Sequence, residues 1–231
     1  MSIPPADVVD LWTVDLDGEA PARAAAMLDE PERARAQRIV RPIARERFIL
    51  ARAALRTVLG ECLQVAPAAV ALREGPRGKP QLGDATDLSF SLSHTRALAV
   101  IAVTTRERIG VDVETRGRPI PPAVLRRVLD DRELALVLAL PEAAREEAFL
   151  RHWTAKEAYV KALGTGLATG LRGVAVRDAL TTPALVDEPD GTPWRVQRFD
   201  PRPEAIGAVV VSGAAWTARR RNLRTADSLS L

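Results

Sequence analysis

The sequence predicts an α+β protein built from two similar halves that pack around a shared cleft. Strand-like and helix-like segments come in blocks, in the order strand, helices, strands, helices, strands. Two apolar segments, AVIAVTT at 99–105 and GAVVVSG at 207–213, resemble each other as the closing strands of two related halves would. We place the halves at 1–106 and 107–218 and expect a flexible tail at 219–231.

The first half begins with a strand at 8–16, where apolar and polar residues alternate. Pro31 and Pro42 open two arginine-rich helices, because proline suits the first helical turn. The second helix, at 43–63, has apolar residues at helical spacing, namely Phe48, Ala51, Leu55 and Leu59. After a turn at 75–80, short strands are expected at 88–93, 98–104 and 109–114.

The second half continues with a helical region that Pro121 and Pro122 open. It includes a long helix from about Pro141 to Gly164, a glycine that suits a helix end. Further strands are expected at 174–177, 194–199 and 206–212. After about Ala218 the chain is basic and then polar, which predicts a frayed end.

Composition narrows the classes of function. No run of about 18 apolar residues is present, so we expect no membrane span. The acidic start lacks the basic and apolar regions of a signal peptide. Cys62 is the single cysteine, which excludes an internal disulfide and a cysteine-based zinc site, and a cytoplasmic location fits best. The net charge of +3 suits nucleic acid, a phosphate-rich small ligand or an acidic protein partner.

Lysine is scarce in this chain. Of 33 basic residues only three are lysine, and they lie in the short segments RGKP and WTAKEAYVK. Lysine is a compact charge on a flexible stem and arginine a broad planar fork, so the two are not interchangeable at a tight site. Either codon usage explains this distribution, or the segments that hold Lys79, Lys156 and Lys161 contribute to such a site.

The strand IGVDVE at 109–114 carries two acids on one face. Side chains alternate along a strand, so Asp112 and Glu114 project together while Val111 and Val113 pack on the other side. Neighbouring carboxylates repel each other and tend to hold protons unless a cation lies between them. A hard divalent ion, magnesium above all, suits this face. The alternative is an edge strand whose polar face meets only water.

The segment WTAKEAYVK at 153–161 places Trp153, Glu157 and Lys161 on one helix face at i, i+4 spacing. The tryptophan indicates that this face is at least partly covered, which favours a site over a solvated Glu–Lys pair. Tyr159 is expected in the core or at its rim, and His152 on the helix surface. In FSLSHT, His94 stands at a strand end between hydroxyls, as a capped structural residue or a ligand contact would.

Together these segments resemble the Sfp-type 4'-phosphopantetheinyl transferase family. Its three signatures appear in order, as RGKP at 77–80, FSLSHT at 90–95 joined to IGVDVE at 109–114, and WTAKEAYVKALGTGL at 153–167. The resemblance covers nearly the whole chain and implies the fold of the monomeric, two-half members. It also implies transfer of the phosphopantetheine arm of coenzyme A to a serine of an apo acyl- or peptidyl-carrier protein, with release of 3',5'-ADP.

The same resemblance implies roles for single residues. Magnesium, or manganese, would be held by Asp112, Glu114 and Glu157 and would bridge the pyrophosphate of coenzyme A. Asp112, Glu157 and Lys161 would be catalytic, with Lys161 beside the phosphates and either Glu157 or a water next to the metal taking the serine proton. Contacts to coenzyme A are expected from Arg47, Arg52, Lys79, Ser93, His94, Lys156 and Lys161. Arg47 and Arg52 are the candidates for its 3'-phosphate.

An acidic carrier protein would need a basic, partly apolar surface beside the cleft. Residues 115–130 are the candidate, and an ordinary amphipathic helix is the alternative. Carriers of fatty-acid, polyketide and nonribosomal peptide synthesis all remain open.

Three other functions stay open from the sequence. A nucleic-acid-binding module would rest on the arginine count alone, without a recognisable motif, and acidic residues nearly balance that count. A different magnesium-dependent phosphate-transfer enzyme would also suit the acidic strand, although a P-loop signature is missing. A catalytically inactive relative that only binds coenzyme A is disfavoured by the intact acids and Lys161.

Overall fold

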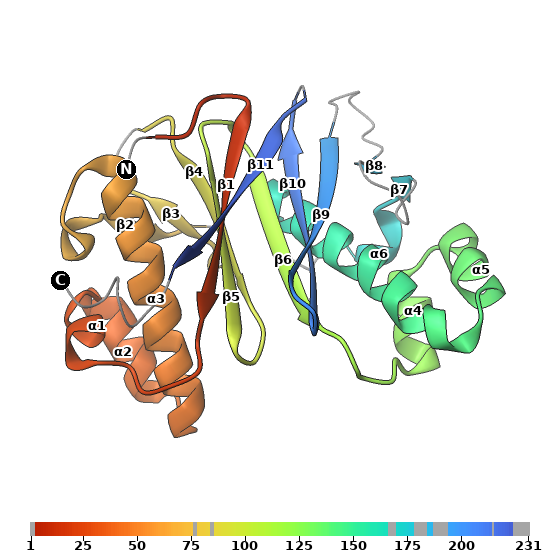
Figure 1. Cartoon of the computed structure of the whole chain (residues 1–231), viewed down its shortest axis with the longest axis horizontal. Helices are drawn as coiled ribbons and strands as arrows, with labels where there is room; N and C mark the ends of the chain where they lie inside the picture. Colours follow the sequence, from red (N-terminus) through yellow and green to blue (C-terminus); the bar gives the residue numbers. More distant parts are fainter. Residues whose placement is uncertain are drawn as a thin grey trace.

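The computed structural model describes residues 3–75, 78–83, 86–165, 170–177, 184–186, 194–213 and 215–223. These residues are layered as helix, sheet, sheet, helix, with the first half on one side of Figure 1 and the second on the other. The strand order is β11-β1-β5-β4 in the first sheet and β6-β10-β9-β8-β7 in the second. Within the described residues, no helix combines the length and apolarity that a membrane crossing requires.

The first half contains short helices, one long helix and a small hairpin beside the main sheet. Its elements are β1 (Val8–Asp15), α1 (Ala22–Ala26), α2 (Glu30–Arg38), α3 (Pro42–Leu63), η1 (Pro67–Ala69), β2 (Leu72–Glu74), β3 (Pro80–Leu82), β4 (Ser89–His94) and β5 (Leu98–Thr104). Within the described ranges, the strands β2 and β3 pair with each other and with no third strand. The hairpin therefore stands apart from the main sheet of this half.

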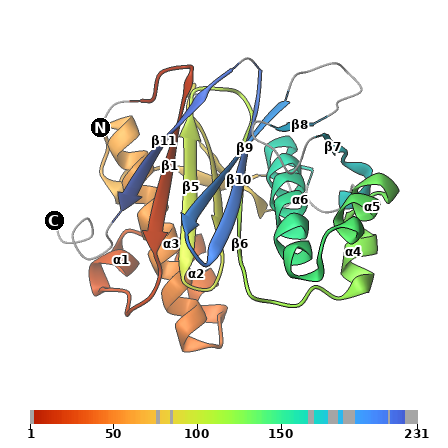
Figure 2. The ribbon, with the colours of Figure 1, turned by 45° about the vertical axis from the view of Figure 1, so that its right-hand side comes forward.

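The second half has the same plan, with a long helix against a sheet. Its elements are β6 (Ile109–Thr115), α4 (Pro122–Val128), α5 (Asp131–Ala139), α6 (Glu142–Leu163), η4 (Leu171–Gly173), β7 (Val176–Arg177), β8 (Ala184–Val186), β9 (Trp194–Arg202) and β10 (Ala205–Ser212). Figure 2 shows α4 and α5 beside α6, on the outer side of the second sheet. The last strand, β11 (Thr217–Leu223), returns to the first sheet.

Strand alternation creates the layers. In β5, Ala99, Ile101 and Val103 pack in the cluster that contains α3, whereas Leu98, Val100 and Ala102 pack in the cluster between the two sheets. In β6, Ile109, Val111 and Val113 belong to that inter-sheet cluster as well. Because successive strand residues face opposite sides, Asp112 and Glu114 are turned toward α6. The buried apolar face of β6 thus fixes where its acids point.

The α+β architecture with two similar halves is confirmed. The segments 99–105 and 207–213 correspond to the inner strands β5 and β10, one in each main sheet. The predicted long helices correspond to α3 and α6, and their bounds differ by one residue or so from those expected. The hairpin β2–β3, the helix α1 and the short strand β8 were not expected, because each is three to five residues long and has no clear periodicity.

Two expectations are wrong. His152 is 2% exposed rather than on the helix surface, because α5 covers that side of α6 and brings Glu133 to it. Residues 219–223 are not a frayed tail, since they belong to β11, which pairs with β1 in parallel. Arg219 forms an ion pair with the buried Asp10 of β1, and a polar segment can therefore be ordered by long-range pairing. Residues 224–231 lie outside the described part of the chain.

Gly110 lets α6 lie directly on β6. A Cβ atom at this position would stand 1.8 Å from the carbonyl oxygen of Ala158 in α6. We expect Gly110→Ala to push α6 away from β6 and to lower the free energy of unfolding by about 1–3 kcal/mol or more, as overpacking does. Thermal unfolding measures this effect. Gly173→Ala is the control, because a Cβ there meets no atom within 4 Å; equal melting of both variants would contradict the expectation.

Candidate active site at the junction of the two sheets

The two sheets meet where the edge strand β4 lies beside the edge strand β6, and hydroxyl groups connect them. Ser91 Oγ accepts a hydrogen bond from the Val111 amide at 3.1 Å, and Ser93 Oγ donates to Asp112 Oδ1 at 2.8 Å. At the end of the junction, Thr95 Oγ1 and Thr115 Oγ1 are 2.7 Å apart. Ser91, Ser93 and Thr95, every second residue of the SLSHT segment, therefore form hydrogen bonds with β6. These bonds bring the polar end of β4 next to the acidic strand.

Lys161 joins this junction from the last turn of α6. Its Nζ donates to Asp112 Oδ1 at 2.7 Å and to Ser93 Oγ at 2.9 Å. The other oxygen of Asp112, Oδ2, is buried and has no hydrogen-bond partner among the described residues. A buried carboxylate oxygen without a partner is costly, and it indicates room for a donor or cation that this described part of the chain does not supply.

The predicted face of α6 does turn toward β6. Trp153 Nε1 donates to Glu114 Oε1 at 3.2 Å, and Lys161 contacts Asp112 two turns further along the helix. Glu157 lies between these two residues on the same face. The interpretation of Trp153, Glu157 and Lys161 as a covered stripe is therefore confirmed, and each acid of β6 has one partner on it.

The three carboxylates influence one another electrostatically. Burial, followed by the negative charges of Asp112 and Glu114, raises the pKa of Glu157 to about 7, although Lys161 opposes this shift. Burial and the charge of Asp112 also raise the pKa of Glu114, against the hydrogen bond from Trp153. Both shifts have the sign expected for crowded acids that share too little positive charge.

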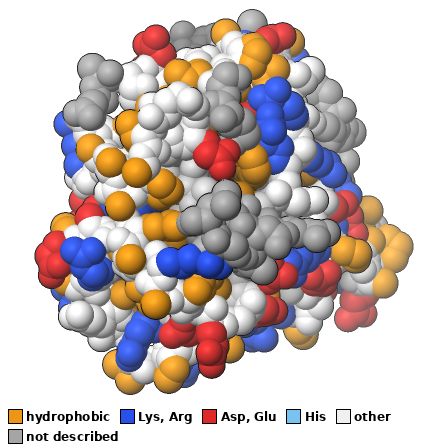
Figure 3. Space-filling view, turned by 60° about the vertical axis from the view of Figure 1, so that its left-hand side comes forward, with side chains coloured by type: hydrophobic (Ala, Val, Ile, Leu, Met, Phe, Trp, Pro, Cys, Tyr) orange, Lys and Arg blue, Asp and Glu red, His pale blue; other side chains and the backbone are white. Residues whose placement is uncertain are grey.

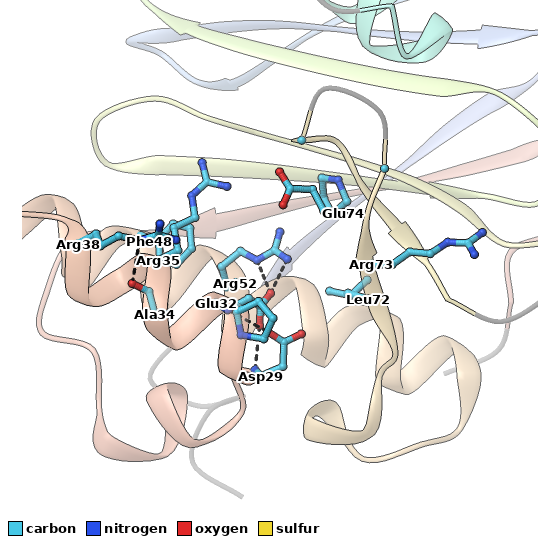
Figure 4. Close-up of a pocket in the computed structure, with 14 residues that line it drawn as sticks. Asp29, Glu32, Ala34, Arg35, Arg38, Phe48, Arg52, Leu72, Arg73 and Glu74 are labelled. Atoms are coloured by element: carbon cyan, nitrogen blue, oxygen red, sulfur yellow. Dashed lines mark hydrogen bonds and ion pairs between the residues drawn. The ribbon is translucent and has the colours of Figure 1, made fainter.

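A pocket of about 1140 Å³ opens in the first half, between α2, α3 and the hairpin β2–β3. Figure 4 shows Arg35 and Arg52 rising from the two helices toward the side of the hairpin on which Glu74 lies. Phe48 and Leu72 supply apolar surface, and the guanidinium of Arg35 stands 5.4 Å from the centre of the Phe48 ring. Basic side chains beside an aromatic ring suit a ligand that carries both a phosphate and a flat ring.

His94 connects this pocket with the acids. The ring remains exposed, and desolvation of its covered part, together with the positive charges of Lys161 and Arg35, lowers its pKa. Arg35 belongs to the pocket and Lys161 to the acidic junction, and both are close enough to act on the same imidazole. His94 therefore lies within electrostatic reach of both the pocket and the acidic junction.

Comparison with known proteins identifies the family of this chain. Residues 108–211, which contain β6 and α6, match the model of the 4'-phosphopantetheinyl transferase superfamily. The chain is 36% identical to the 4'-phosphopantetheinyl transferase HetI of Nostoc sp. over 91% of its own length and 90% of that protein. The chain belongs to this family. It is also 23% identical to the 4'-phosphopantetheinyl transferase Sfp of Bacillus subtilis, over 81% of its own length and 84% of that protein.

The carboxylates of β6 and α6 are the candidate ligands for a divalent metal ion. Among the described residues, no group of three or more His, Cys, Asp or Glu side chains is already arranged as a metal cluster. The donor set nevertheless fits a hard divalent ion in kind, because carboxylate oxygens are its preferred ligands. The unpartnered Asp112 Oδ2 and the raised pKa values of Glu114 and Glu157 are what a missing positive charge would produce.

Lys156 is not part of the site, contrary to its expected contact with coenzyme A. The side chain is 0% exposed and faces α5 instead of β6. Its Nζ donates to Glu133 Oε2 at 2.5 Å and to the carbonyl oxygens of Val128 and Leu171 at 2.8 and 3.1 Å. Lys156, the lysine of the Lys-Glu pair in the transferase signature, thus joins α6 to α4 and α5.

Arg47 and Arg52 differ in position. Arg52 lines the pocket and donates from Nε to Glu32 Oε1 at 2.5 Å. Arg47 does not line it, because its Nη2 is turned to Asp17 at 2.8 Å. Sequence reasoning did not identify Arg35, Arg38 and Arg73, which the pocket includes. They lie in an arginine-rich stretch and a short hairpin, where no spacing distinguishes ligand-facing arginines from solvated ones.

Lys79 of the RGKP signature binds backbone rather than pocket. Its Nζ donates to the carbonyl oxygens of Ile109 and Lys161, at 3.1 and 2.7 Å. With Lys156 and Lys161, all three lysines of the chain place their ammonium groups among two or three converging acceptors. A tetrahedral ammonium suits such acceptors better than a planar guanidinium does, which gives a physical reason for lysine at these positions.

Proposed function

We propose that this chain transfers the 4'-phosphopantetheine group of coenzyme A to a serine of an apo acyl- or peptidyl-carrier protein and releases 3',5'-ADP. The single observation that carries the proposal is the meeting of Asp112 and Glu114 on β6 with Glu157 and Lys161 on α6. Anionic diphosphates need such a combination of metal-binding acids and a fixed ammonium. The family to which the chain belongs supports the same reaction.

The pocket is proposed to bind the nucleotide end of coenzyme A. Arg35 and Arg52 are placed to hold its 3'-phosphate, and Phe48 offers an apolar face to the adenine. His94, which lies within the electrostatic reach of both Arg35 and Lys161, would then sit beside the path from the nucleotide to the diphosphate. This assignment retains Arg52 of the two expected arginines and replaces Arg47 by Arg35.

The reacting end is proposed to lie at the junction of the sheets. Asp112, Glu114 and Glu157 would hold a magnesium or manganese ion, which supplies Lewis-acid chemistry and charge neutralisation when bound. Lys161, oriented by Ser93, would place its ammonium beside the phosphate that leaves with the adenosine. Glu157 would accept the proton of the carrier serine as the serine oxygen attacks the β-phosphate.

The carrier protein is proposed to approach over α4 and the segment that precedes it. Arg118, Arg126 and Arg127 are exposed there, and Arg118 is close enough to act on Glu114. Arg116, also in the candidate segment 115–130, is instead held by Asp200 and by the carbonyl oxygens of Pro203 and Ala205. Ile120, Val124 and Leu125 pack on the core of the second half, which limits the apolar part of this surface.

Both sides of the proposed site come from one chain, which supports action as a monomer. The proposed cytoplasmic location rests on the sequence, which has a single cysteine. The nucleic-acid-binding alternative is not favoured. On the face of the molecule in Figure 3, basic side chains alternate with acidic and apolar ones and do not form one continuous basic stripe. A nucleic-acid-binding face usually gathers its lysines and arginines along such a stripe.

The function is tested by incubating the protein with coenzyme A, magnesium and a panel of apo-carriers from fatty-acid, polyketide and nonribosomal peptide synthesis. A carrier that is modified on its serine gains about 340 Da, the mass of one phosphopantetheine group. Mass spectrometry of each carrier identifies the accepted class. A panel that stays entirely unmodified, with a carrier serine known to be accessible, would refute the proposal.

A change in the pocket is expected to affect coenzyme A selectively. Arg35→Met removes a charge that is proposed to bind the 3'-phosphate, and a hydrogen bond to a charged group contributes about 1.5–3 kcal/mol, roughly 10- to 100-fold in kcat/KM. With 3'-dephospho-coenzyme A the same variant is expected to lose little. Arg47→Met is the control, because Arg47 pairs with Asp17 outside the pocket. Equal losses with both substrates would place the 3'-phosphate elsewhere.

A further inference from the structure

Lys79 connects three parts of the molecule that are far apart in the sequence. It stands in the turn of the hairpin β2–β3, and its Nζ donates to the Ile109 carbonyl at 3.1 Å and to the Lys161 carbonyl at 2.7 Å. Ile109 is the first residue of β6, the strand that carries the two acids. Lys161 lies in the last turn of α6 and supplies the ammonium at the junction. One side chain thus touches both elements that build the reacting end.

The local chemistry explains why an ammonium suits this position. The last carbonyl groups of a helix have no partner in the next turn and carry the negative end of the helix dipole. The Lys161 carbonyl also accepts a weaker contact from the Gly164 amide at 3.2 Å, so Lys79 makes its shorter hydrogen bond. Burial, followed by the charge of Lys161, lowers the pKa of Lys79 to about 8, a cost that the two carbonyl acceptors offset.

The hairpin turn is built to hold Lys79 in place. The Gly75 amide donates to the Lys79 carbonyl at 2.8 Å, and the Gly78 amide to the Gly75 carbonyl at 3.1 Å. Gly78 has a φ of +80°, a conformation that glycine adopts without strain. A Cβ at Gly75 would stand 2.8 Å from the Lys79 carbonyl oxygen, so the turn closes tightly around the lysine. The Lys79 backbone is therefore fixed before its side chain reaches β6 and α6.

Lys79 also differs from the residues that surround the nucleotide pocket. Its neighbours Gly78 and Pro80 line the pocket, whereas Lys79 does not. Two of its three N–H groups are used by backbone carbonyls on the side of the second half. A lysine that served the phosphates of a ligand would keep its ammonium free for them, as Arg35 keeps its guanidinium at the pocket.

We propose that Lys79 is a positioning residue, which clasps the start of β6 to the end of α6 and thereby sets Asp112 and Lys161 in register for the transfer. It is not a contact to the nucleotide end of coenzyme A, which the family resemblance led us to expect. This inference rests on the proposed transferase function for its kinetic part. The clasp itself is a property of the fold and can be measured without turnover.

The test uses Lys79→Met, which keeps an unbranched side chain one atom shorter than lysine and removes its charge and donors. We expect kcat to fall by about 10- to 100-fold, because a small misplacement of reacting groups has such effects. The dissociation constant for 3',5'-ADP, measured by calorimetry without metal, is expected to stay unchanged. Arg35→Met is the matched comparison and is expected to do the reverse, weakening 3',5'-ADP while changing kcat less.

Hydrogen exchange of the backbone amides gives a readout that does not depend on activity. In Lys79→Met, exchange is expected to accelerate at the start of β6 and the end of α6, and to stay unchanged in α3. Weaker 3',5'-ADP binding together with a normal kcat and unchanged exchange would overturn the proposal. If the parent protein modifies no carrier but Lys79→Met still shows the faster exchange, the contact of Lys79 with β6 and α6 is supported and the transferase function is refuted.

If Lys79→Met does not fold at the assay temperature, Lys79→Arg replaces it. The guanidinium keeps the charge and is planar, so it does not meet both carbonyl groups as the ammonium does. We then expect a smaller loss of kcat, again with unchanged affinity for 3',5'-ADP. An arginine variant with normal kcat and weakened 3',5'-ADP binding would show that Lys79 is a ligand contact.

Discussion

Glu157→Gln is expected to lower kcat by about 10²- to 10⁴-fold, the range that a positioned general base contributes, with the fold unchanged. The substitution keeps the size of the side chain and removes both its proton-accepting capacity and one proposed ligand of the metal ion. Steady-state transfer to an apo-carrier at saturating coenzyme A measures the effect. Glu147→Gln is the control, because Glu147 pairs with Arg151 on the same helix at a half-exposed surface. Near-normal turnover of Glu157→Gln would exclude Glu157 from catalysis.

The same variant has an expected signature in stability. The pKa of Glu157 is raised to about 7 in the fold, mainly by burial and then by the charge of Asp112. The folded state therefore disfavours the ionised side chain, and this cost grows as pH rises above the ordinary glutamate value and is complete above about 7. Glutamine does not ionise, so the variant lacks this destabilising contribution. Without metal and at mildly alkaline pH, Glu157→Gln is expected to melt at or above the temperature of the parent protein, which separates lost chemistry from lost structure.

Lys156→Met is expected to destabilise the protein by about 3–5 kcal/mol, because it leaves the carboxylate of Glu133 buried without its charge partner. Lys156 is fully buried and holds α5 to α6 through Glu133, while its contacts with Val128 and Leu171 tie in the end of α4 and the turn η4. For a chain of this size each kcal/mol corresponds to about 2–4 °C in melting temperature. Thermal or urea unfolding of parent and variant measures the difference.

The double variant Lys156→Met/Glu133→Leu provides the control for this prediction. Replacing both partners of a buried ion pair by apolar groups is often far less costly than removing one. We therefore expect the double variant to recover part of the loss. It does not recover all of it, because Glu133 also accepts from the Asp130 amide at 2.9 Å and completes the capping box of α5. A double variant no more stable than Lys156→Met would show that the pair is not coupled.

The pH dependence of this pair has a definite sign. Burial opposes the ionisation of Glu133, but His152, whose Nδ1 lies 3.5 Å from Oε1, and the hydrogen bond and charge of Lys156 outweigh it and lower its pKa to about 2. A lowered carboxyl pKa contributes stability that is complete above the ordinary value of about 4.3 and is lost as pH falls toward about 2. The parent protein is thus expected to lose this contribution between those two values, while Lys156→Met, which lacks the ammonium partner, changes less over the same interval.

The core of the site could be predicted from the sequence because its signals are local. Alternation in IGVDVE indicated the common face of Asp112 and Glu114, and i, i+4 spacing indicated that of Trp153, Glu157 and Lys161. Both follow from the geometry of one strand and one helix. Lys156 could not be assigned in this way. It adjoins Glu157 in sequence but faces another side of α6, and its partner Glu133 lies on a different helix.

The pocket of the first half and the last strand could not be predicted from the sequence, because both depend on contacts between distant segments. The pocket combines α2, α3 and the hairpin β2–β3, so its arginines become neighbours only after three separate elements have packed. The polarity of RRRNLRTADSLSL favoured a frayed end, whereas Arg219 and Arg221 pair with Asp10, and the Arg221 guanidinium lies 5.2 Å from the centre of the Trp12 ring. Charges that a local interpretation assigns to solvent are here satisfied by the opposite end of the chain.

The parallel pairing of β11 with β1 has a consequence for biosynthesis. Val8 is paired with Thr217 and Val14 with Leu223, so one edge of β1 has no neighbour until residue 223 has left the ribosome. During translation the nascent first half exposes that bare edge, a template for unwanted association with other chains. If the gene were split between the halves, β11 would be synthesised with the second half, although it belongs to the sheet of the first. The two halves are related in plan, but the sheet of the first half is complete only when β11 is present.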